Sequence, residues 1–276
     1  MRVLMCRPTY YTVRDVKNPF MRGAATVDPQ RALAQWTALH DAFAAAGVEP
    51  LEIEPVADLE DMTFAANLAF VGAGSRTRRF VVPSRMRFAS RAREVPYYVA
   101  WFEAHGFAVV DLALEGDEYL EGHGDLVWQP GRSRVWAGYG FRSSRTGVER
   151  FARAMSRESI EVVPLDLADE TFYHLDTCFA TLGAEAALYY PGAFSEKARD
   201  TLRAAWPRLY EVSREDALRF VCNGAAVANR FIAAYIPPAL EAPLRREGLQ
   251  PFVVDTSEFE KGGGSVFCLK CFLPEG

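Results

Sequence analysis

The chain switches five times from a helical pattern of apolar residues to an extended one, and this alternation constrains its fold more than any other feature. The five pairs of segments are residues 29–46 with 48–53, 95–105 with 107–112, 148–156 with 160–165, 196–206 with 209–212, and 239–247 with 251–254. Such alternation is typical of α/β proteins. Because no linker or low-complexity stretch interrupts it, we predict one domain over residues 1–276.

The first helical segment has the clearest limits. Asp28 and Pro29 supply an N-terminal cap and a first-turn proline, and Gly47 supplies the stop. The face that we expect to be buried consists of Leu33, Trp36, His40 and Phe43. Residues 1–7 precede this helix and predict a buried first strand, because their apolar run is too short for a signal peptide.

A second recurring element lies between these pairs and consists of polar or glycine-rich turns beside apolar stretches. Its instances are Asp61-Met-Thr-Phe-Ala-Ala-Asn67, Glu121-Gly-His-Gly-Asp125, His174-Leu-Asp176, Cys222-Asn-Gly224 and Gly262-Gly-Gly-Ser-Val-Phe-Cys268. Their spacing suggests about five related units. In such a fold the turns gather at one end of a central axis, so residues as distant in sequence as Asp61 and Cys268 are expected to meet. A generic α/β domain with loops at its strand ends is the alternative.

The composition narrows the class of partner. The net charge is -5 and basic residues form no cluster, which argues against nucleic acid and suits a cationic small molecule. No apolar run reaches the roughly 18 residues that span a membrane. The five cysteines form an odd set without a dense framework, which favours free thiols and a cytoplasmic location.

Cys268 is the candidate nucleophile. It follows Gly262-Gly-Gly264, whose backbone can approach a ligand closely. A thiol beside exposed amides or a cation has a lowered pKa and reacts more readily. A buried structural cysteine is the alternative. Cys268 and Cys271 also form a C-x-x-C pair, but no second ligand pair accompanies it, so we expect neither a metal nor an organic cofactor.

A histidine and several acids complete the set of candidates. His174 and Asp176 would share one face of a strand, where the histidine can serve as acid and base. His123 is the weaker alternative for this role. The acids Asp61, Glu121 and Asp125 would form a receptor for a planar cation such as guanidinium, with neutral hydrogen bonds from Asn18 and Asn67.

Six motifs, taken together, resemble the amidinotransferase, dimethylarginine dimethylaminohydrolase and arginine dihydrolase branch of the pentein superfamily, whose members modify guanidino groups. The motifs are Asn18-Pro-Phe-Met21, Asp61-Met-Thr-Phe-Ala-Ala-Asn67, Glu121-Gly-His-Gly-Asp125, Trp136-Ala-Gly-Tyr-Gly-Phe-Arg142, Phe172-Tyr-His-Leu-Asp-Thr177 and Gly262-Gly-Gly-Ser-Val-Phe-Cys268. They occur in the family's order and span nearly the whole chain.

The resemblance implies an α/β fold of five pseudo-symmetric blades, the pentein propeller, with a central active site. It implies that Cys268 attacks the guanidinium carbon while Glu121 and Asp61 bind its nitrogens. His174 would protonate the departing amine and then activate water. Asp176 would support the substrate or His174. Arg142, with Arg87 or Arg91, would bind a substrate α-carboxylate.

The function implied is hydrolysis of a C–N bond in arginine or a substituted arginine. Amidino transfer to an amine is the first alternative, and a non-catalytic guanidine-binding protein is the second. Asn18 and Asn67 match two asparagines of bacterial arginine dihydrolases. Ala65 stands where that group usually has threonine, and His123 is unusual in its turn, so the substrate stays open. The expected partner is a small guanidino cation, without nucleic acid or membrane; a homo-oligomer is compatible with the sequence.

Overall fold

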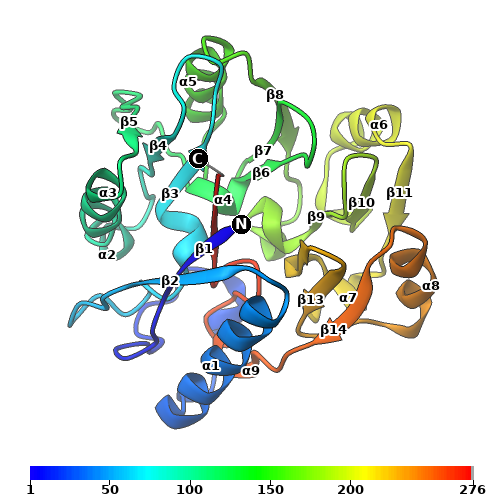
Figure 1. Ribbon diagram of the computed structural model, residues 1–276, viewed down its shortest axis with the longest axis horizontal. Coiled ribbons are helices and arrows are strands. Elements are labelled where there is room, and N and C mark those ends of the chain that lie inside the picture. The colour runs from blue at the N-terminus through cyan, green and yellow to red at the C-terminus, as the bar shows by residue number, and fades with distance from the viewer. Residues whose placement is uncertain (275–276) are drawn as a thin grey trace.

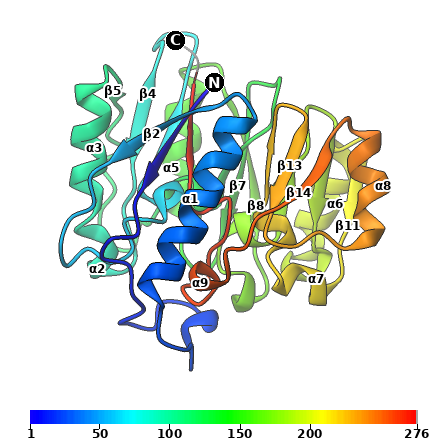
Figure 2. The same cartoon turned by 60° about the horizontal axis from the view of Figure 1, so that its bottom comes forward.

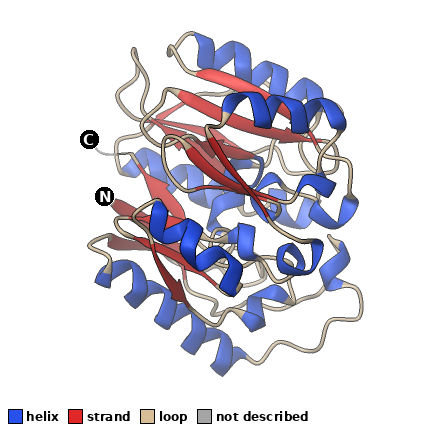
Figure 3. Cartoon of the chain, turned by 90° about the vertical axis from the view of Figure 1, so that its right-hand side faces the viewer, coloured by secondary structure: helices blue, strands red, loops and turns tan. Residues whose placement is uncertain are grey.

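Five three-stranded sheets surround a central axis, and the longer helices cover the outside of the ring (Figure 1). The computed structural model describes residues 1–274. The strands lie between the outer helices and the axis (Figure 3). The predicted α/β ring of five blades is therefore confirmed.

Each sheet is built to the same plan. The sheets have the strand orders β15-β1-β2, β3-β4-β5, β6-β7-β8, β9-β10-β11 and β12-β13-β14. In every sheet the middle strand is antiparallel to the first of these strands and parallel to the last. The parallel pair needs a crossover connection, which a helix on the outside of the ring provides.

The elements have the following bounds. The strands are β1 (Arg2–Cys6), β2 (Glu49–Ile53), β3 (Ala69–Gly72), β4 (Phe80–Pro83), β5 (Ala108–Val109), β6 (Leu126–Trp128), β7 (Arg134–Tyr139), β8 (Glu161–Asp166), β9 (Phe179–Thr181), β10 (Ala186–Tyr189), β11 (Arg208–Glu211), β12 (Ala225–Val227), β13 (Arg230–Ala233), β14 (Gln250–Val253) and β15 (Cys271–Leu273). The α-helices are α1 (Pro29–Ala45), α2 (Ala89–Ala92), α3 (Val95–Ala104), α4 (Gly122–Asp125), α5 (Arg145–Ser156), α6 (Glu196–Ala205), α7 (Arg214–Leu218), α8 (Pro238–Arg246) and α9 (Ser257–Glu260). The 3-10 helices are η1 (Pro19–Met21), η2 (Ala65–Leu68), η3 (Glu170–Phe172), η4 (Leu175–Thr177), η5 (Pro191–Ala193) and η6 (Val221–Asn223).

The five predicted pairs of segments are the crossover helices and the outer strands that follow them. They correspond to α1 with β2, α3 with β5, α5 with β8, α6 with β11, and α8 with β14. The extended segment predicted over 107–112 is the poorest match, because only Ala108–Val109 pair with β4. The predicted first strand is β1, which lies at the middle of its sheet.

The predicted buried face of α1 is partly wrong. Asp28 caps the helix as expected, accepting hydrogen bonds from the next turn's backbone. Trp36 and Phe43 are buried, but Leu33 is 43% exposed and His40 is only half-buried beside the Trp36 ring. Leu39 packs inward in their place. An amphipathic stripe about 100° wide is compatible with several neighbouring sets of residues, and Leu33 lies just outside the stripe that is buried in the structure.

A short turn of helix or a tight bend precedes the first strand of each sheet. These segments are η2 before β3, α4 before β6, η4 before β9, η6 before β12, and residues 265–270 before β15. They are the recurring turn elements of the sequence, and they gather at the axis. The strand expected around His174 and Asp176 is absent, because His174 stands at the N-cap position of η4, without a capping hydrogen bond from its side chain, and Asp176 lies within η4.

Buried apolar side chains form four clusters around the ring. Within residues 1–274, no helix combines the length and the apolar character that crossing a bilayer requires.

Candidate active site

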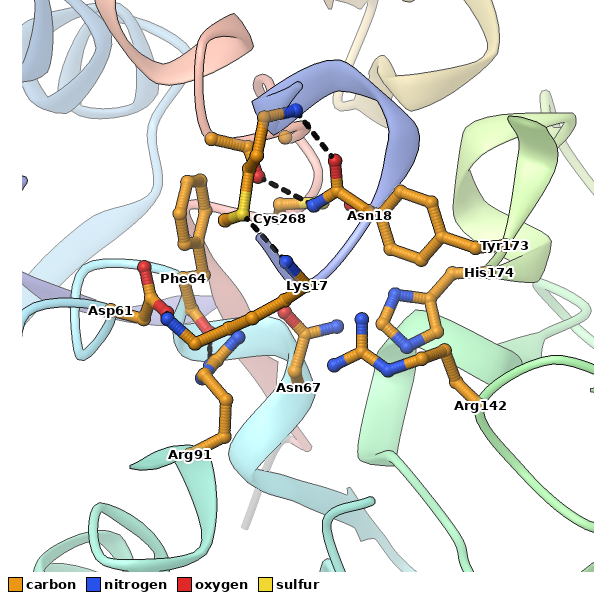
Figure 4. Close-up of a pocket in the computed structure, with 13 residues that line it drawn as sticks. Lys17, Asn18, Asp61, Phe64, Asn67, Arg91, Arg142, Tyr173, His174 and Cys268 are labelled. Carbon is orange, nitrogen blue, oxygen red and sulfur yellow. Dashed lines mark hydrogen bonds and ion pairs between the residues drawn. The ribbon is translucent and has the colours of Figure 1, made fainter. Parts of the chain in front are cut away.

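A small polar cavity lies among the axial segments (Figure 4). It is lined by Lys17, Asn18, Met21, Asp61, Phe64, Asn67, Arg91, Arg142, Tyr173, His174, Gly262, Gly264 and Cys268. Its volume is only about 10 Å³, on the scale of a single water molecule.

Cys268 is buried at the wall of this cavity. Its Sγ donates a hydrogen bond to Asp176 Oδ2 at 3.1 Å and accepts one from Asn223 Nδ2 at 3.2 Å. The Asn223 Oδ1 accepts hydrogen bonds from the backbone N–H of Ser265 and of Cys268, so one amide positions both the segment and the thiol. The Cys268 thiol is thus held by side chains from two other blades.

The expected lowering of the Cys268 pKa is wrong for this arrangement. Burial, together with the neighbouring Asp176 carboxylate, raises the pKa of the thiol well above its ordinary value. Burial also raises the pKa of Asp176 to about 7, against the hydrogen bond from Cys268 and the charge of Lys270. The pair therefore holds a protonated thiol, and a cation that arrives beside it would favour the thiolate.

The glycine run makes room for neighbouring side chains. Gly263 has a φ of +86°, and a Cβ there would lie 2.6 Å from the Asn18 amide. A Cβ on Gly264 would lie 2.7 Å from the Phe64 ring and 2.9 Å from the Cβ of Cys268. Glycine is needed here so that the segment can approach these groups.

His174 is held by a charged network. Its Nε2 lies 2.9 Å from Glu121 Oε2, which leaves Nδ1 as the ring nitrogen not bound to this carboxylate. Arg142 binds the same carboxylate with two nitrogens. Its Nη2 lies 2.8 Å from Glu121 Oε2, and its Nε donates a hydrogen bond to Glu121 Oε1 at 3.1 Å. Burial alone would raise the pKa of Glu121, but Arg142 and His174 outweigh it and hold the pKa far below its usual range. Glu121 is therefore anionic and orients the histidine.

His123, the weaker alternative for the acid and base, faces away from the cavity. Its Nε2 accepts a hydrogen bond from the Val71 N–H, and its Nδ1 lies 3.1 Å from the Leu126 carbonyl oxygen. Burial, aided by the charge of Lys270, lowers the pKa of His123 to about 3. Both ring nitrogens serve the backbone, so this alternative is not supported.

Asp125 lies behind His174. Its two oxygens accept the backbone N–H groups of Ser143 and Leu175, and Oδ2 lies 4.0 Å from His174 Nε2. Burial raises its pKa to about 6. Asp125 does not line the cavity, and it ties the Glu121 turn to two neighbouring segments.

Asp61 lies on another wall of the cavity beside Lys17. The Lys17 Nζ is 3.0 Å from Asp61 Oδ2 and 3.4 Å from Glu60 Oε1. Both partners are nearly fully buried. The carboxylate expected to receive a guanidinium therefore already faces the ammonium group of the protein itself.

The two asparagines differ in how many hydrogen bonds they already make. Asn18 Oδ1 caps η1 by accepting from two backbone N–H groups, and its Nδ2 donates to the Gly262 oxygen at 2.9 Å. The buried Nδ2 of Asn67 has no hydrogen-bond partner within residues 1–274. Asn67 therefore has amide hydrogens to offer to a ligand.

The three arginines occupy different positions. Arg91 lines the inner cavity and pairs with Glu94 at 2.8 Å, while Arg142 is engaged with Glu121. Arg87 lies in an outer cavity of about 210 Å³ that shares Lys17, Asn18, Arg142 and Tyr173 with the inner one. An extended substrate reaching outward from Cys268 would pass Arg142 and then Arg87.

The structure thus brings most predicted site residues to one cavity, whereas Glu121 and Asp176 lie directly behind its wall. It adds three groups that sequence reasoning missed, which are Lys17, Tyr173 and Asn223. Asn223 had a signal, because it lies in the recurring Cys222-Asn-Gly224 turn. Tyr173 lies inside a motif already noted, and nothing in the sequence distinguishes Lys17 from a solvated lysine.

Together with the five-sheet ring, this arrangement defines an enzyme of the pentein fold that acts on a guanidino group. A family model described as N,N dimethylarginine dimethylhydrolase, eukaryotic, matches residues 7–272, and the chain belongs to this family.

Relatives of known activity fall into two groups. The chain is 36% identical over 267 residues to the N(G),N(G)-dimethylarginine dimethylaminohydrolase of Mycobacterium tuberculosis, covering 97% of this chain and 84% of that protein. It is also 36% identical over 278 residues to the bifunctional arginine dihydrolase/ornithine cyclodeaminase ArgZ of Synechocystis, covering all of this chain but only 38% of ArgZ. The match to ArgZ thus concerns a part of that protein.

Solved structures of the N-terminal domain of ArgZ are closely similar. One is a cysteine-to-serine mutant bound to substrate, and another is bound covalently to a reaction intermediate. Each has a TM-score of 0.92 and 35% sequence identity, covering 99% of this chain and 98% of the domain. With the family match, these findings show that the chain is an enzyme that hydrolyses the guanidino group of arginine or dimethylarginine.

Proposed function

We propose that the substrate is unsubstituted arginine and that the chain removes both guanidino nitrogens, giving ornithine, two ammonia molecules and carbon dioxide. The observation that carries this proposal is the unpartnered Nδ2 of Asn67 in the cavity that holds Cys268. The first hydrolysis converts a cationic guanidinium into a neutral ureido group with a carbonyl oxygen. An amide can donate to that oxygen, whereas a carboxylate can only accept hydrogen bonds.

Binding begins with an exchange of cations at Asp61. The guanidinium takes the place of the Lys17 ammonium, which lies 3.0 Å from that carboxylate. The exchange preserves charge balance in a site where an unpaired carboxylate would be costly. The arriving cation also favours the thiolate form of Cys268, whose proton passes to Asp176 across the 3.1 Å hydrogen bond.

Bond formation then follows in two halves. Cys268 Sγ bonds to the guanidinium carbon, protonated His174 gives its proton to one terminal nitrogen, and ammonia leaves with the C–N bond. An amidino group remains on sulfur. Water next loses a proton to His174 and bonds to the carbon, the C–S bond breaks, and the sulfur recovers its proton from Asp176. The ureido product and one ammonium ion result.

A second cycle acts on the ureido group at the same thiol. Cys268 passes its proton to Asp176 and its sulfur bonds to the ureido carbon. Protonated His174 gives its proton to the departing nitrogen, so ammonia leaves with the C–N bond and a carbamoyl group remains on sulfur. Water releases this group as a carbamate, which loses carbon dioxide to give the amine of ornithine. Asn67 supports this cycle by holding the ureido oxygen, while Arg87 and Arg142 at the outer cavity are suited to the α-carboxylate.

The test is the product stoichiometry. The protein is incubated with arginine, monomethylarginine and dimethylarginine, with and without amine acceptors, and ornithine, citrulline, ammonia and methylamines are quantified by mass spectrometry. We expect two ammonia molecules per ornithine from arginine. Faster turnover of dimethylarginine would contradict the assigned substrate, and an amidino group on the acceptor would show a transferase instead.

Asn67→Asp sharpens the test because it keeps the side-chain shape while removing the donor. We expect citrulline to accumulate with about one ammonia each, and ornithine formation to fall by about 100-fold, the scale of one lost oxyanion donor. Asn229→Asp, an exposed position, adds the same charge elsewhere and should leave the products unchanged. Unchanged ornithine formation in Asn67→Asp would remove the main support for the proposal.

Three further expectations complete the proposed function. Residues 1–276 act as one catalytic domain, the protein works in the cytoplasm, and the assembly is a homo-oligomer. Gel filtration with light scattering, and localisation of a tagged chain, would test the last two.

A further inference from the structure

A second, larger cavity lies at the other end of the segment that carries Cys268. Its volume is about 480 Å³, and its apolar lining includes Val127, Trp128, Leu182, Leu249, Phe267 and Phe272. Gly262 and Gly264 border the catalytic cavity, whereas Phe272 to Pro274 border this one. Figure 2 shows β15 running from the α9 end of the molecule toward the two chain ends. The two cavities therefore lie on opposite sides of the ring.

The side chain of Lys270 borders this apolar space. Lys270 is 2% exposed, and its Nζ lies 3.1 Å from the centre of the Phe267 ring and 4.5 Å from that of Phe272. Within the part of the chain that the structure describes, its ammonium group has no carboxylate ion pair. A buried charge without a counter-ion is costly, and burial accordingly lowers the pKa of Lys270 to about 7.

The other ionisable groups near Lys270 are already engaged elsewhere. Asp176 accepts a hydrogen bond from Cys268. Cys271 is a buried thiol, and burial raises its pKa to about 12. His123 borders the same cavity, but both of its ring nitrogens serve the backbone. Lys270 therefore borders this cavity without an ion pair to a carboxylate among residues 1–274.

The chemistry of the cavity selects one class of ligand. Its volume falls within the range of small-molecule sites. The Lys270 ammonium group matches one negative charge, and the second charge of a phosphate would face the apolar side chains around it. We infer that this cavity is a second binding site, which takes a small monocarboxylic acid with an apolar tail and pairs its carboxylate with Lys270. The inference does not depend on which arginine derivative the enzyme hydrolyses.

The test is calorimetric titration of the full chain with octanoate and with octanamide, its neutral counterpart. Lys270→Met keeps the apolar stem and removes the charge, and Lys197→Met removes an exposed lysine as the control. We expect Lys270→Met to weaken octanoate binding at least about tenfold while octanamide binding changes little. Lys197→Met should bind octanoate like the parent protein. Equal octanoate affinity in the parent and Lys270→Met would overturn the inference.

A second variant separates this site from the catalytic one. Ala226→Leu adds bulk to the wall of the cavity and leaves Lys270 in place, so it should reduce the affinity for octanoate and octanamide together. In a Cys268→Ala background, saturating arginine should leave octanoate binding unchanged, because the two ligands occupy different cavities. Competition between arginine and octanoate would place the acid in the catalytic cavity and contradict the proposal. Undetectable octanoate binding to the parent protein at millimolar concentration would also reject it.

Discussion

The catalytic cavity is flanked by two buried carboxylates, Glu121 and Asp176, whose charges are controlled in opposite ways. Glu121 is held by Arg142 and His174, and its pKa lies far below the ordinary range despite burial. Asp176 faces the neutral Cys268 thiol, and burial raises its pKa to about 7. One side of the cavity thus carries a fixed negative charge, and the other carries a group that can exchange a proton near neutral pH.

In the proposed mechanism, this difference separates two tasks. A permanently charged acid can orient a histidine without taking its proton, as an anionic carboxylate does in other acid–base networks. An acid with a pKa near neutrality can accept the proton of the thiol and return it. Neighbouring residues, rather than the identity of the acid, assign these tasks.

The largest effect is expected at the thiol itself. Cys268→Ala removes the proposed nucleophile, and we expect kcat to fall by at least about 10⁴-fold. The measurement is single-turnover release of ammonia from arginine, with mass spectrometry of the intact protein to detect any adduct. Retention of turnover, or an adduct on another residue, would show that a different group attacks.

Glu121→Gln tests the fixed charge. The amide cannot balance Arg142, so we expect kcat to fall by about 10²- to 10⁴-fold and the unfolding free energy by about 3 kcal/mol. Glu118→Gln is the matched control, because Glu118 pairs with Arg150 nearer the surface at 3.0 Å. Steady-state rates and urea denaturation measure both effects. Equal losses in the two variants would mean that Glu121 has no special role.

Asp176→Asn tests the exchangeable charge. The raised pKa of Asp176 adds stability below about pH 4, and this contribution disappears as the pH rises to about 7. Relative to the variant, the parent protein should therefore lose stability between these pH values and then level off. We also expect kcat to fall by about 100-fold, because asparagine cannot accept the thiol proton. Urea denaturation across pH 4.5 to 8, with rates at each pH, measures both; a parallel pH dependence would rule out the assignment.

The smallest effect is expected at Cys271. Burial raises the pKa of this thiol to about 12, so it stays protonated, and it packs against the strand β1. Cys271→Ala should change kcat by less than about twofold and cost roughly 1 kcal/mol of stability for the lost packing. Alkylation with iodoacetamide, followed by peptide mapping, should leave Cys271 unmodified in the folded parent. Rapid alkylation there would challenge the contrast between the two cysteines.

The fold was predictable from sequence because helix and outer strand recur with local signals. Asp28 caps α1 and Gly47 follows its end, so a few neighbouring residues determine the limits of the helix. The short axial turns carry no such periodicity. His174 and Asp176 alternate as strand residues would, yet His174 directly precedes a 3-10 turn and Asp176 lies in it, because contacts from other blades determine the local backbone.

The sequence predicted most of the residues that form the site, but not their protonation or their neighbours. Cys268, His174 and Asp61 reach one cavity as the motifs implied. The protonation of Cys268 was not predictable, because it depends on burial and on Asp176, which is far away in sequence. Lys17 was missed for the same reason, since its importance comes only from its distance to Asp61.

The pairing of β15 with β1 has a consequence for how activity first arises. Leu4 lies opposite Cys271, so the strand that follows Cys268 is paired with a segment that is more than 260 residues away in sequence. Contacts of such long sequence separation form late and slowly during folding. A chain in which β15 has not yet paired with β1 would contain every residue of the proposed site and still be inactive. Activity would therefore appear only after the ring of sheets has closed.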